Sequence, residues 1–226
     1  MGHGSSAGEQ SGAGAAPIRQ GVAGYPANLV VRDRRCVVVG AGRIAARKIE
    51  GLVSAGARVH VVALEIGEEV RAWAAGGTVT VSERAFDAAD LDDAWLATTA
   101  TGVPAVDRAV FAAGEARHVW VNSADDPTSC SFTLMSVVRQ GDLVVAIGSN
   151  GRSPALATYL RDHVRKEMGP EWAALLELLS EAREEMRAGG RSSETADWRR
   201  ALDSGILDLV REGRDGEAKE LLRSCL

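Results

Sequence analysis

Short apolar runs alternate with amphipathic stretches along the first half of the chain. Five apolar runs have the length and β-branched content of buried strands; they lie at 35–39, 58–63, 78–82, 95–100 and 118–123. Helical patterns follow three of them, at 43–56, 67–75 and 104–116. This alternation predicts an α/β fold, in which helices cover both faces of a parallel sheet.

The pattern changes after Asp125. Extended segments at 131–140 and 143–148 flank the turn dipeptide Gly141-Asp142, which predicts a hairpin instead of another strand–helix–strand unit. A two-stranded hairpin alone is marginally stable in water. We therefore expect a small dimerisation module over 126–152 that pairs with its copy in a homodimer.

The last third of the chain has a helical pattern. We expect residues 153–226 to form a helical domain, with a linker at 189–194 and two shorter helices beyond it. At the other end, residues 1–24 are rich in Gly, Ala, Ser and Gln and lack the basic start and apolar stretch of a secretory signal. We expect them to be a disordered leader outside the fold.

Composition excludes several classes of protein. A net charge of −5 over 226 residues, without a basic stripe, argues against nucleic acid as a partner. No apolar run approaches the roughly 18 residues that span a membrane, so a soluble protein is expected. Cys36, Cys130 and Cys225 are far apart and form neither a disulfide framework nor a CxxC site. This use of cysteine favours a reducing, cytoplasmic location. The histidines show no paired spacing, so we expect no metal site.

A glycine turn follows the first apolar run. Gly40-Ala41-Gly42-Arg43-Ile44-Ala45 matches the GxGxx(G/A) pattern between a strand and a helix. Gly40 allows the tight turn, Gly42 lets the backbone approach a pyrophosphate, and the helix N-terminus attracts the anion. The pattern predicts a Rossmann-like NAD-binding domain over residues 25–125. A glycine turn that only packs is the alternative.

The second strand carries the next expected cofactor contact. Dinucleotide sites place an acid at its end for the adenosine ribose, and Glu65 is the acid there, slightly late in the sequence. The backbone around Leu64 and Glu65 is an alternative cradle for the adenosine. No basic cluster marks a 2′-phosphate site, although Arg43 is one candidate, so we favour NAD over NADP.

Four stretches in order give the chain a family resemblance. They are YPANLVVRDRRCVVVGAGRIAARKIEGLVSAGARVHVVA, WLATTAT, VNSADDPTSCSF and LVVAIGSNGRSPALATYLR. With them the chain resembles the precorrin-2 dehydrogenase family, which forms the N-terminal module of siroheme synthase, over about residues 25–165. The resemblance implies NAD-dependent oxidation of precorrin-2 to sirohydrochlorin, and some members of the family also insert ferrous iron.

The resemblance also implies site residues. It places the catalytic aspartate at Asp125, and a serine that is phosphorylated in some members at Ser149. The expected cofactor-binding residues are Gly40, Ala41, Gly42, Arg43, Ile44, Leu64, Glu65 and Thr101. The expected substrate-binding residues are Ser149, Arg152 and Ser153, beside basic residues that suit a substrate with eight carboxylates.

Some positions depart from the family pattern. Thr101-Gly102-Val103 replaces a Thr-Asp-Asp run, Asp107 stands at an Asn position, and Met135 replaces a proline. A related NAD-dependent oxidoreductase with another substrate is therefore one alternative. A non-catalytic NAD- or tetrapyrrole-binding sensor is another, against which the presence of Asp125 argues.

Asp125 itself has a structural alternative. It precedes Asp126-Pro127, and Asx-Pro steps often start turns. Asp126 is a second carboxylate that either acts with Asp125 or is a solvated turn residue. Iron insertion requires a ligand over the macrocycle, for which Asp125 is the best candidate.

Overall fold

The computed structural model describes residues 24–226, so the expected leader lies outside the described residues except for Gly24. The chain divides into two compact units. The first runs to Leu134 and includes Asn150–Arg152, and the second comprises Met135–Ser149 and Ser153–Leu226. The hairpin and the C-terminal helices thus share one unit, whereas the sequence suggested separate segments.

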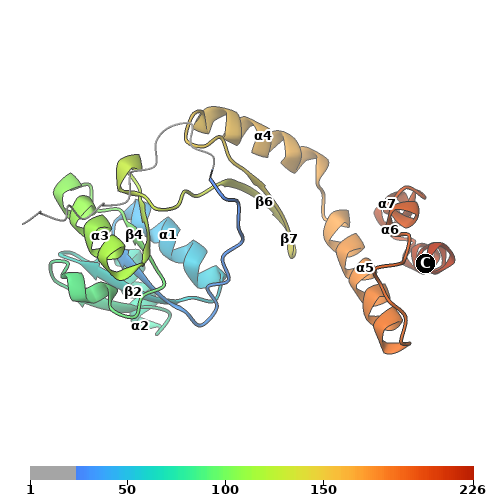
Figure 1. The fold of residues 1–226 in the computed structure, drawn as a ribbon, viewed down its shortest axis with the longest axis horizontal. Helices are drawn as coiled ribbons and strands as arrows, with labels where there is room; N and C mark the ends of the chain where they lie inside the picture. The colour runs from blue at the N-terminus through green and yellow to red at the C-terminus, as the bar shows by residue number, and fades with distance from the viewer. Residues whose placement is uncertain (1–23) are drawn as a thin grey trace, which may run out of the picture. The chain divides into compact units, whose positions relative to one another are not determined.

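The first unit is built on a parallel sheet (Figure 1). Its strands lie in the order β3-β2-β1-β4-β5, and every neighbouring pair is parallel. Their bounds are β1 Arg35–Val39, β2 Arg58–Ala63, β3 Thr80–Glu83, β4 Leu96–Thr99 and β5 Trp120–Ser123. The α/β fold with a Rossmann-like sheet is confirmed.

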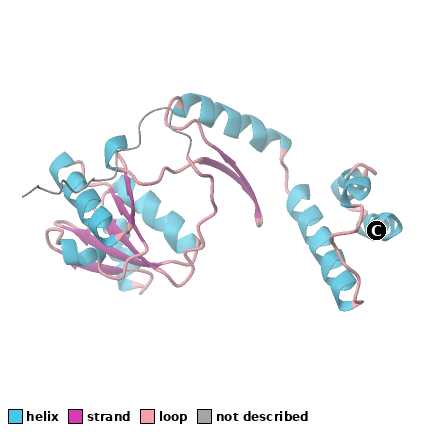
Figure 2. Cartoon of the chain, in the orientation of Figure 1, coloured by secondary structure: helices cyan, strands magenta, loops and turns pink. Residues whose placement is uncertain are grey.

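Helices cover both faces of this sheet, as Figure 2 shows in cyan against the magenta strands. The helices are α1 Arg43–Ser54, α2 Glu68–Ala75 and α3 Pro104–Arg117, with short 3₁₀ turns at η1 Ala88–Leu91 and η2 Pro127–Ser129. Ile49 of α1 and Val70 of α2 pack with Val38 on one face. Val110 of α3 packs with Val37 on the other face. Successive side chains of β1 therefore pack into two different cores, one on each face of the sheet.

Element ends differ from the sequence prediction for local reasons. The fifth strand begins at Trp120 rather than at residue 118. His118 instead ends α3 in the left-handed conformation, with φ of 57°. The third strand is likewise Thr80–Glu83 rather than 78–82.

The second unit contains the predicted hairpin. Strands β6 Ser136–Gln140 and β7 Leu143–Ile147 pair antiparallel around Gly141, which has a positive φ of 56°. The helices of this unit are α4 Pro154–Glu167, α5 Glu171–Ala188, α6 Trp198–Leu202, α7 Ile206–Arg211 and α8 Asp215–Cys225. Three helices therefore follow the linker, and the expectation of two was wrong because Gly205, with φ of 84°, starts an additional helix.

The C-terminal helices have a core of their own. Leu175 and Leu178 of α5 pack with Ile206 of α7 and Leu222 of α8. Among the described residues, no helix is long and apolar enough to cross a membrane.

Candidate functional site

A cavity of about 730 Å³ opens at the carboxyl ends of the parallel strands. The glycine turn after β1, the end of β2 and the loop after β4 line it. Its lining includes Gly40, Ala41, Gly42, Leu64, Glu65 and Thr101, which are six of the eight predicted cofactor-binding residues. Ligands of open α/β sheets bind at this edge.

The two glycines of the turn have different roles. Gly40 is buried, has φ of 107°, and leaves no room for a Cβ against the carbonyl group of Ala100. Gly42 is exposed, and no atom lies within 4 Å of the place where its Cβ would be. Gly40 therefore shapes the turn, and Gly42 leaves the cradle at the cavity open.

Helix α1 begins directly after Gly42. Gly42 occupies the N-cap position, and no side chain caps the helix there. The first backbone N–H groups of a helix and its dipole favour an anion. Arg43 and Ile44 are exposed in this first turn, although they do not line the cavity. An open cradle of this kind fits a pyrophosphate.

An apolar wall stands beside the glycine turn. Leu64 is 74% exposed and Val103 is 49% exposed, and both line the cavity together with Phe86. Ligand pockets are lined mainly by apolar side chains, so this wall suits a ligand with an apolar face. The carboxylate of Glu65 lies next to Leu64 and is also exposed.

The loop after β4 is held by a carboxylate that the sequence analysis did not assign to the site. Asp107 of α3 is 2% exposed and accepts hydrogen bonds from the hydroxyls of Thr99 and Thr101. The Thr101 Oγ1–Asp107 Oδ1 distance is 2.8 Å. Thr101 Oγ1 also accepts a 3.0 Å bond from the N–H of Val103. Asp107 thus fixes the part of the cavity wall that carries Thr101.

The adjacent carboxylates after β5 differ in their surroundings. Asp126 caps η2, accepting bonds from the N–H and hydroxyl of Thr128 and from the hydroxyl of Ser129. These bonds, led by the one from the Thr128 hydroxyl, lower the pKa of Asp126 below its usual value. Asp125 is exposed, and within residues 24–226 no hydrogen bond or ion pair engages its carboxylate. The turn role therefore belongs to Asp126.

The loop that carries Asp125 is fixed at both ends. Val121 and Ser131 exchange hydrogen bonds, Val121 N to Ser131 Oγ at 2.7 Å and Ser131 N to Val121 O at 2.8 Å. Inside the loop the buried Sγ of Cys130 accepts a 3.2 Å bond from the N–H of Ser123. Asp125 therefore stands on a braced loop at the carboxyl edge, although it does not line the cavity.

The predicted substrate-binding residues lie around the start of α4. Ser153 caps this helix by accepting a 3.2 Å bond from the N–H of Leu156, and Ser149 Oγ accepts a 3.1 Å bond from the N–H of Ser153. Arg152 is exposed. Both serines thus have local roles in the helix start, and contact of all three residues with a substrate stays a prediction. Among the described residues, no group of three potential metal ligands occurs.

Comparisons with known proteins agree with the resemblance found in the sequence. Residues 27–136 match the family described as "Putative NAD(P)-binding". Siroheme synthase of Escherichia coli O157:H7 is 43% identical over 132 residues, which are 58% of this chain and 29% of the relative. Siroheme synthase of Nitrosococcus oceani is 30% identical over 203 residues, 89% of this chain and 43% of the relative. These matches support the resemblance to the N-terminal family of siroheme synthase. The chain spans less than half the length of these two relatives.

A solved structure has the same fold as this chain. The structure of SirC, a precorrin-2 dehydrogenase, superposes with a TM-score of 0.71 at 24% identity. The superposition covers 89% of this chain and 98% of that one. The family resemblance deduced from four sequence stretches is confirmed, and so is the parallel sheet followed by a helical region.

Proposed function

We propose that the protein is an NAD-dependent dehydrogenase that oxidises precorrin-2 to sirohydrochlorin in siroheme biosynthesis. The observation that carries this proposal is a cavity headed by an open glycine turn, in a chain that resembles siroheme synthases, with an unengaged carboxylate on a braced loop at the same sheet edge. Similarity to siroheme synthases and to the fold of SirC supports it.

The cavity residues suit NAD. The N–H groups that follow Gly42 would bind the pyrophosphate, and Leu64 would pack on the adenosine. The exposed carboxylate of Glu65 suits the ribose hydroxyls and would repel a 2′-phosphate, which favours NAD over NADP. When bound, NAD supplies the hydride acceptor.

Asp125 would accept the proton of the reaction. Oxidation of precorrin-2 to sirohydrochlorin removes one hydride and one proton from the macrocycle, giving NADH and H⁺. A carboxylate free of internal hydrogen bonds retains the lone pairs that a base needs. Asp126 lacks this freedom because it caps η2.

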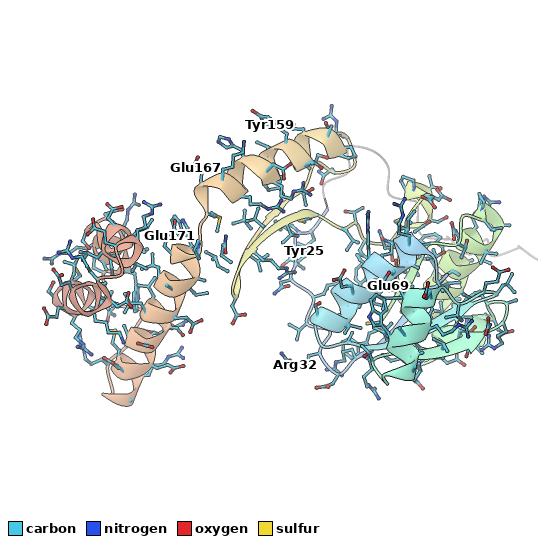
Figure 3. The ribbon with its side chains drawn as sticks, turned by 180° about the vertical axis from the view of Figure 1, so that it is seen from behind. Tyr25, Arg32, Glu69, Tyr159, Glu167 and Glu171 are labelled. Atoms are coloured by element: carbon cyan, nitrogen blue, oxygen red, sulfur yellow. The ribbon has the colours of Figure 1, made fainter. Side chains whose placement is uncertain are left out.

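A homodimer and a cytoplasmic location complete the proposal. Helix α4 exposes Leu156, Tyr159 and Leu160 at helical spacing, and Tyr159, labelled in Figure 3, is 67% exposed. Such a stripe beside a two-stranded hairpin supports burial against a second copy. The three cysteines are free, which supports a reducing compartment.

One incubation tests the activity. The protein is mixed with enzymatically made precorrin-2 and NAD, and the absorption spectra of sirohydrochlorin and NADH are followed. We expect equal amounts of the two products, with slower turnover when NADP replaces NAD. Unchanged precorrin-2 in the presence of folded protein and NAD would contradict the proposed function.

A further inference from the structure

Lys48 lies on α1 and reaches across to β5. Its Nζ donates a 2.7 Å hydrogen bond to Oδ1 of Asn122. Within the described residues, the ammonium group of Lys48 has no second hydrogen-bond acceptor, although an ammonium carries three N–H donors. Lys48 is half-buried. Two of its donors are therefore available to an anion or to water.

The sheet explains why a lysine is accommodated here. Val38, Thr98 and Asn122 are register partners across β1, β4 and β5 and therefore share one face. That face becomes polar from the central strand toward β5. Lys48 is on the helix that covers this face, so its long side chain ends on the polar part.

Asn122 is a fixed partner for Lys48. It is 7% exposed, and its Nδ2 donates a 3.1 Å bond to the carbonyl of Phe132. This bond orients the amide so that Oδ1 faces Lys48. Asn122 lies in β5, three positions before Asp125, so one amide connects the lysine to the segment that carries the candidate base.

The charges around Lys48 leave it short of counter-ions. Burial lowers the pKa of its ammonium group below the usual value, while Cys130 and Asp125 act in the opposite direction. Burial raises the pKa of the Cys130 thiol, which disfavours the thiolate form as a counter-ion for Lys48. The carboxylate of Asp125 is close enough to influence Lys48, yet no ion pair joins the two. A cation held in this way gains from a further anion.

We propose that Lys48 binds a carboxylate of the tetrapyrrole substrate and so positions the macrocycle beside Asp125. The inference rests on the proposed function, because it takes the ligand to be a polycarboxylate. Asn122 holds the ammonium group, and its remaining donors bind the substrate carboxylate. Lys48 is then a substrate-binding residue, and Asp125 stays free for the proton.

Two substitutions test this role. Lys48→Gln removes the charge and keeps an amide that can donate to Asn122, and Lys48→Met keeps the length without a donor. We expect both to weaken binding of uroporphyrin, a stable tetrapyrrole with eight carboxylates, by about tenfold to a hundredfold. The KM for precorrin-2 should rise by a similar factor, with a smaller change in kcat and an unchanged Kd for NAD.

The controls separate charge, fold and function. Lys48→Arg retains the charge and should bind uroporphyrin within about threefold of the wild type. Lys219→Met removes an exposed lysine that pairs with Glu181 at 2.8 Å and should change neither binding nor KM. If folded Lys48→Gln and Lys48→Met bind uroporphyrin as the wild type does, Lys48 is only a structural residue and the inference is wrong.

Binding also keeps this inference distinct from the proposed function. A wild type that does not oxidise precorrin-2 but binds uroporphyrin through Lys48 would overturn the dehydrogenase activity and support the anchoring role. A wild type that binds neither uroporphyrin nor precorrin-2 would overturn both the dehydrogenase activity and the anchoring role.

Discussion

Two adjacent carboxylates with opposite surroundings make the catalytic prediction specific. Asp125→Asn keeps the shape of the side chain and removes the proton acceptor, so sirohydrochlorin formation should fall by about 10²–10⁴-fold. NAD affinity should persist, because the proposed phosphate site is at Gly40–Gly42, which line the cavity that Asp125 does not line. Turnover and calorimetric NAD titration measure the two effects. Turnover near the wild-type rate would return Asp125 to a role as a loop residue.

Asp126→Asn is the matched control. Asp126 caps η2 and binds Thr128 and Ser129, and asparagine caps helix starts as well as aspartate does, so this substitution should lower thermal stability by less than about 1 kcal/mol. Turnover by the folded variant should fall much less than in Asp125→Asn. The reverse ranking of the two variants would make Asp126 the base.

A buried carboxylate in η1, Asp90, gives a prediction about pH. Arg84 donates two bonds to Asp90, which is 6% exposed, and the N–H of Asp87 donates a third. The hydrogen bond from Arg84 is the main cause that lowers the pKa of Asp90. A lowered folded-state pKa stabilises the protein above the unfolded-state value of about 3.9 and loses that effect as pH falls through the folded-state value.

Asp90→Asn should therefore reduce the melting temperature by several degrees at pH 7. The difference from the wild type should shrink as pH falls from about 4 through the folded-state pKa, because the carboxylate takes up a proton first in the unfolded chain and then in the folded protein. Thermal scans at several pH values measure this. A difference that stays constant down to pH 3 would show that the charge of Asp90 is not the cause.

At the scale of residues, the sequence predicts site residues that belong to a local motif. It does not predict residues whose role depends on a contact between separate elements. Gly42 closely follows β1, Leu64 and Glu65 directly follow β2, and all three line the cavity. Asp107 and the Lys48–Asn122 pair depend on contacts between separate elements, with Lys48 and Asn122 lying 74 positions apart. No spacing in the sequence reveals such a pair before the register of β5 is known.

At the scale of elements, the turn between β1 and α1 separates folding from binding. A Cβ at Gly42 meets no protein atom within 4 Å, so Gly42→Val should fold, at a modest cost for a poor N-cap residue. Its side chain would occupy the phosphate cradle. We expect NAD affinity to fall by more than about tenfold in calorimetric titration, with an unchanged circular dichroism spectrum.

Gly40→Ala is the contrasting variant. Its Cβ would meet the Ala100 carbonyl, and φ of 107° disfavours any side chain, so loss of stability should accompany loss of binding. Unchanged NAD affinity in folded Gly42→Val would show that the turn is not the phosphate site.

The elements themselves were largely predictable, and their ends were not. Strands β1 and β2 are short, mainly apolar runs, and Pro104 starts α3 as predicted. The errors in element ends arise where a residue adopts a backbone conformation that is unusual for its type. His118, with its positive φ at the end of α3, is an example. The helices after residue 194 are short and stable through mutual packing, so their number follows from tertiary contacts more than from local pattern.

At the scale of the whole molecule, the open question is what covers the apolar stripe of α4. Leu156→Glu places a charge in that stripe, where the leucine is 52% exposed. If the stripe and hairpin form the dimer contact, burying this charge without a partner is costly. Wild-type protein should scatter light as a dimer at micromolar concentration, and Leu156→Glu should dissociate at least about tenfold more readily. Leu202→Glu is the control, since Leu202 is 44% exposed on α6, away from the stripe in sequence, and should leave the dimer intact. A monomeric wild type would exclude the homodimer. A wild-type dimer that both variants preserve would place its contact on another surface.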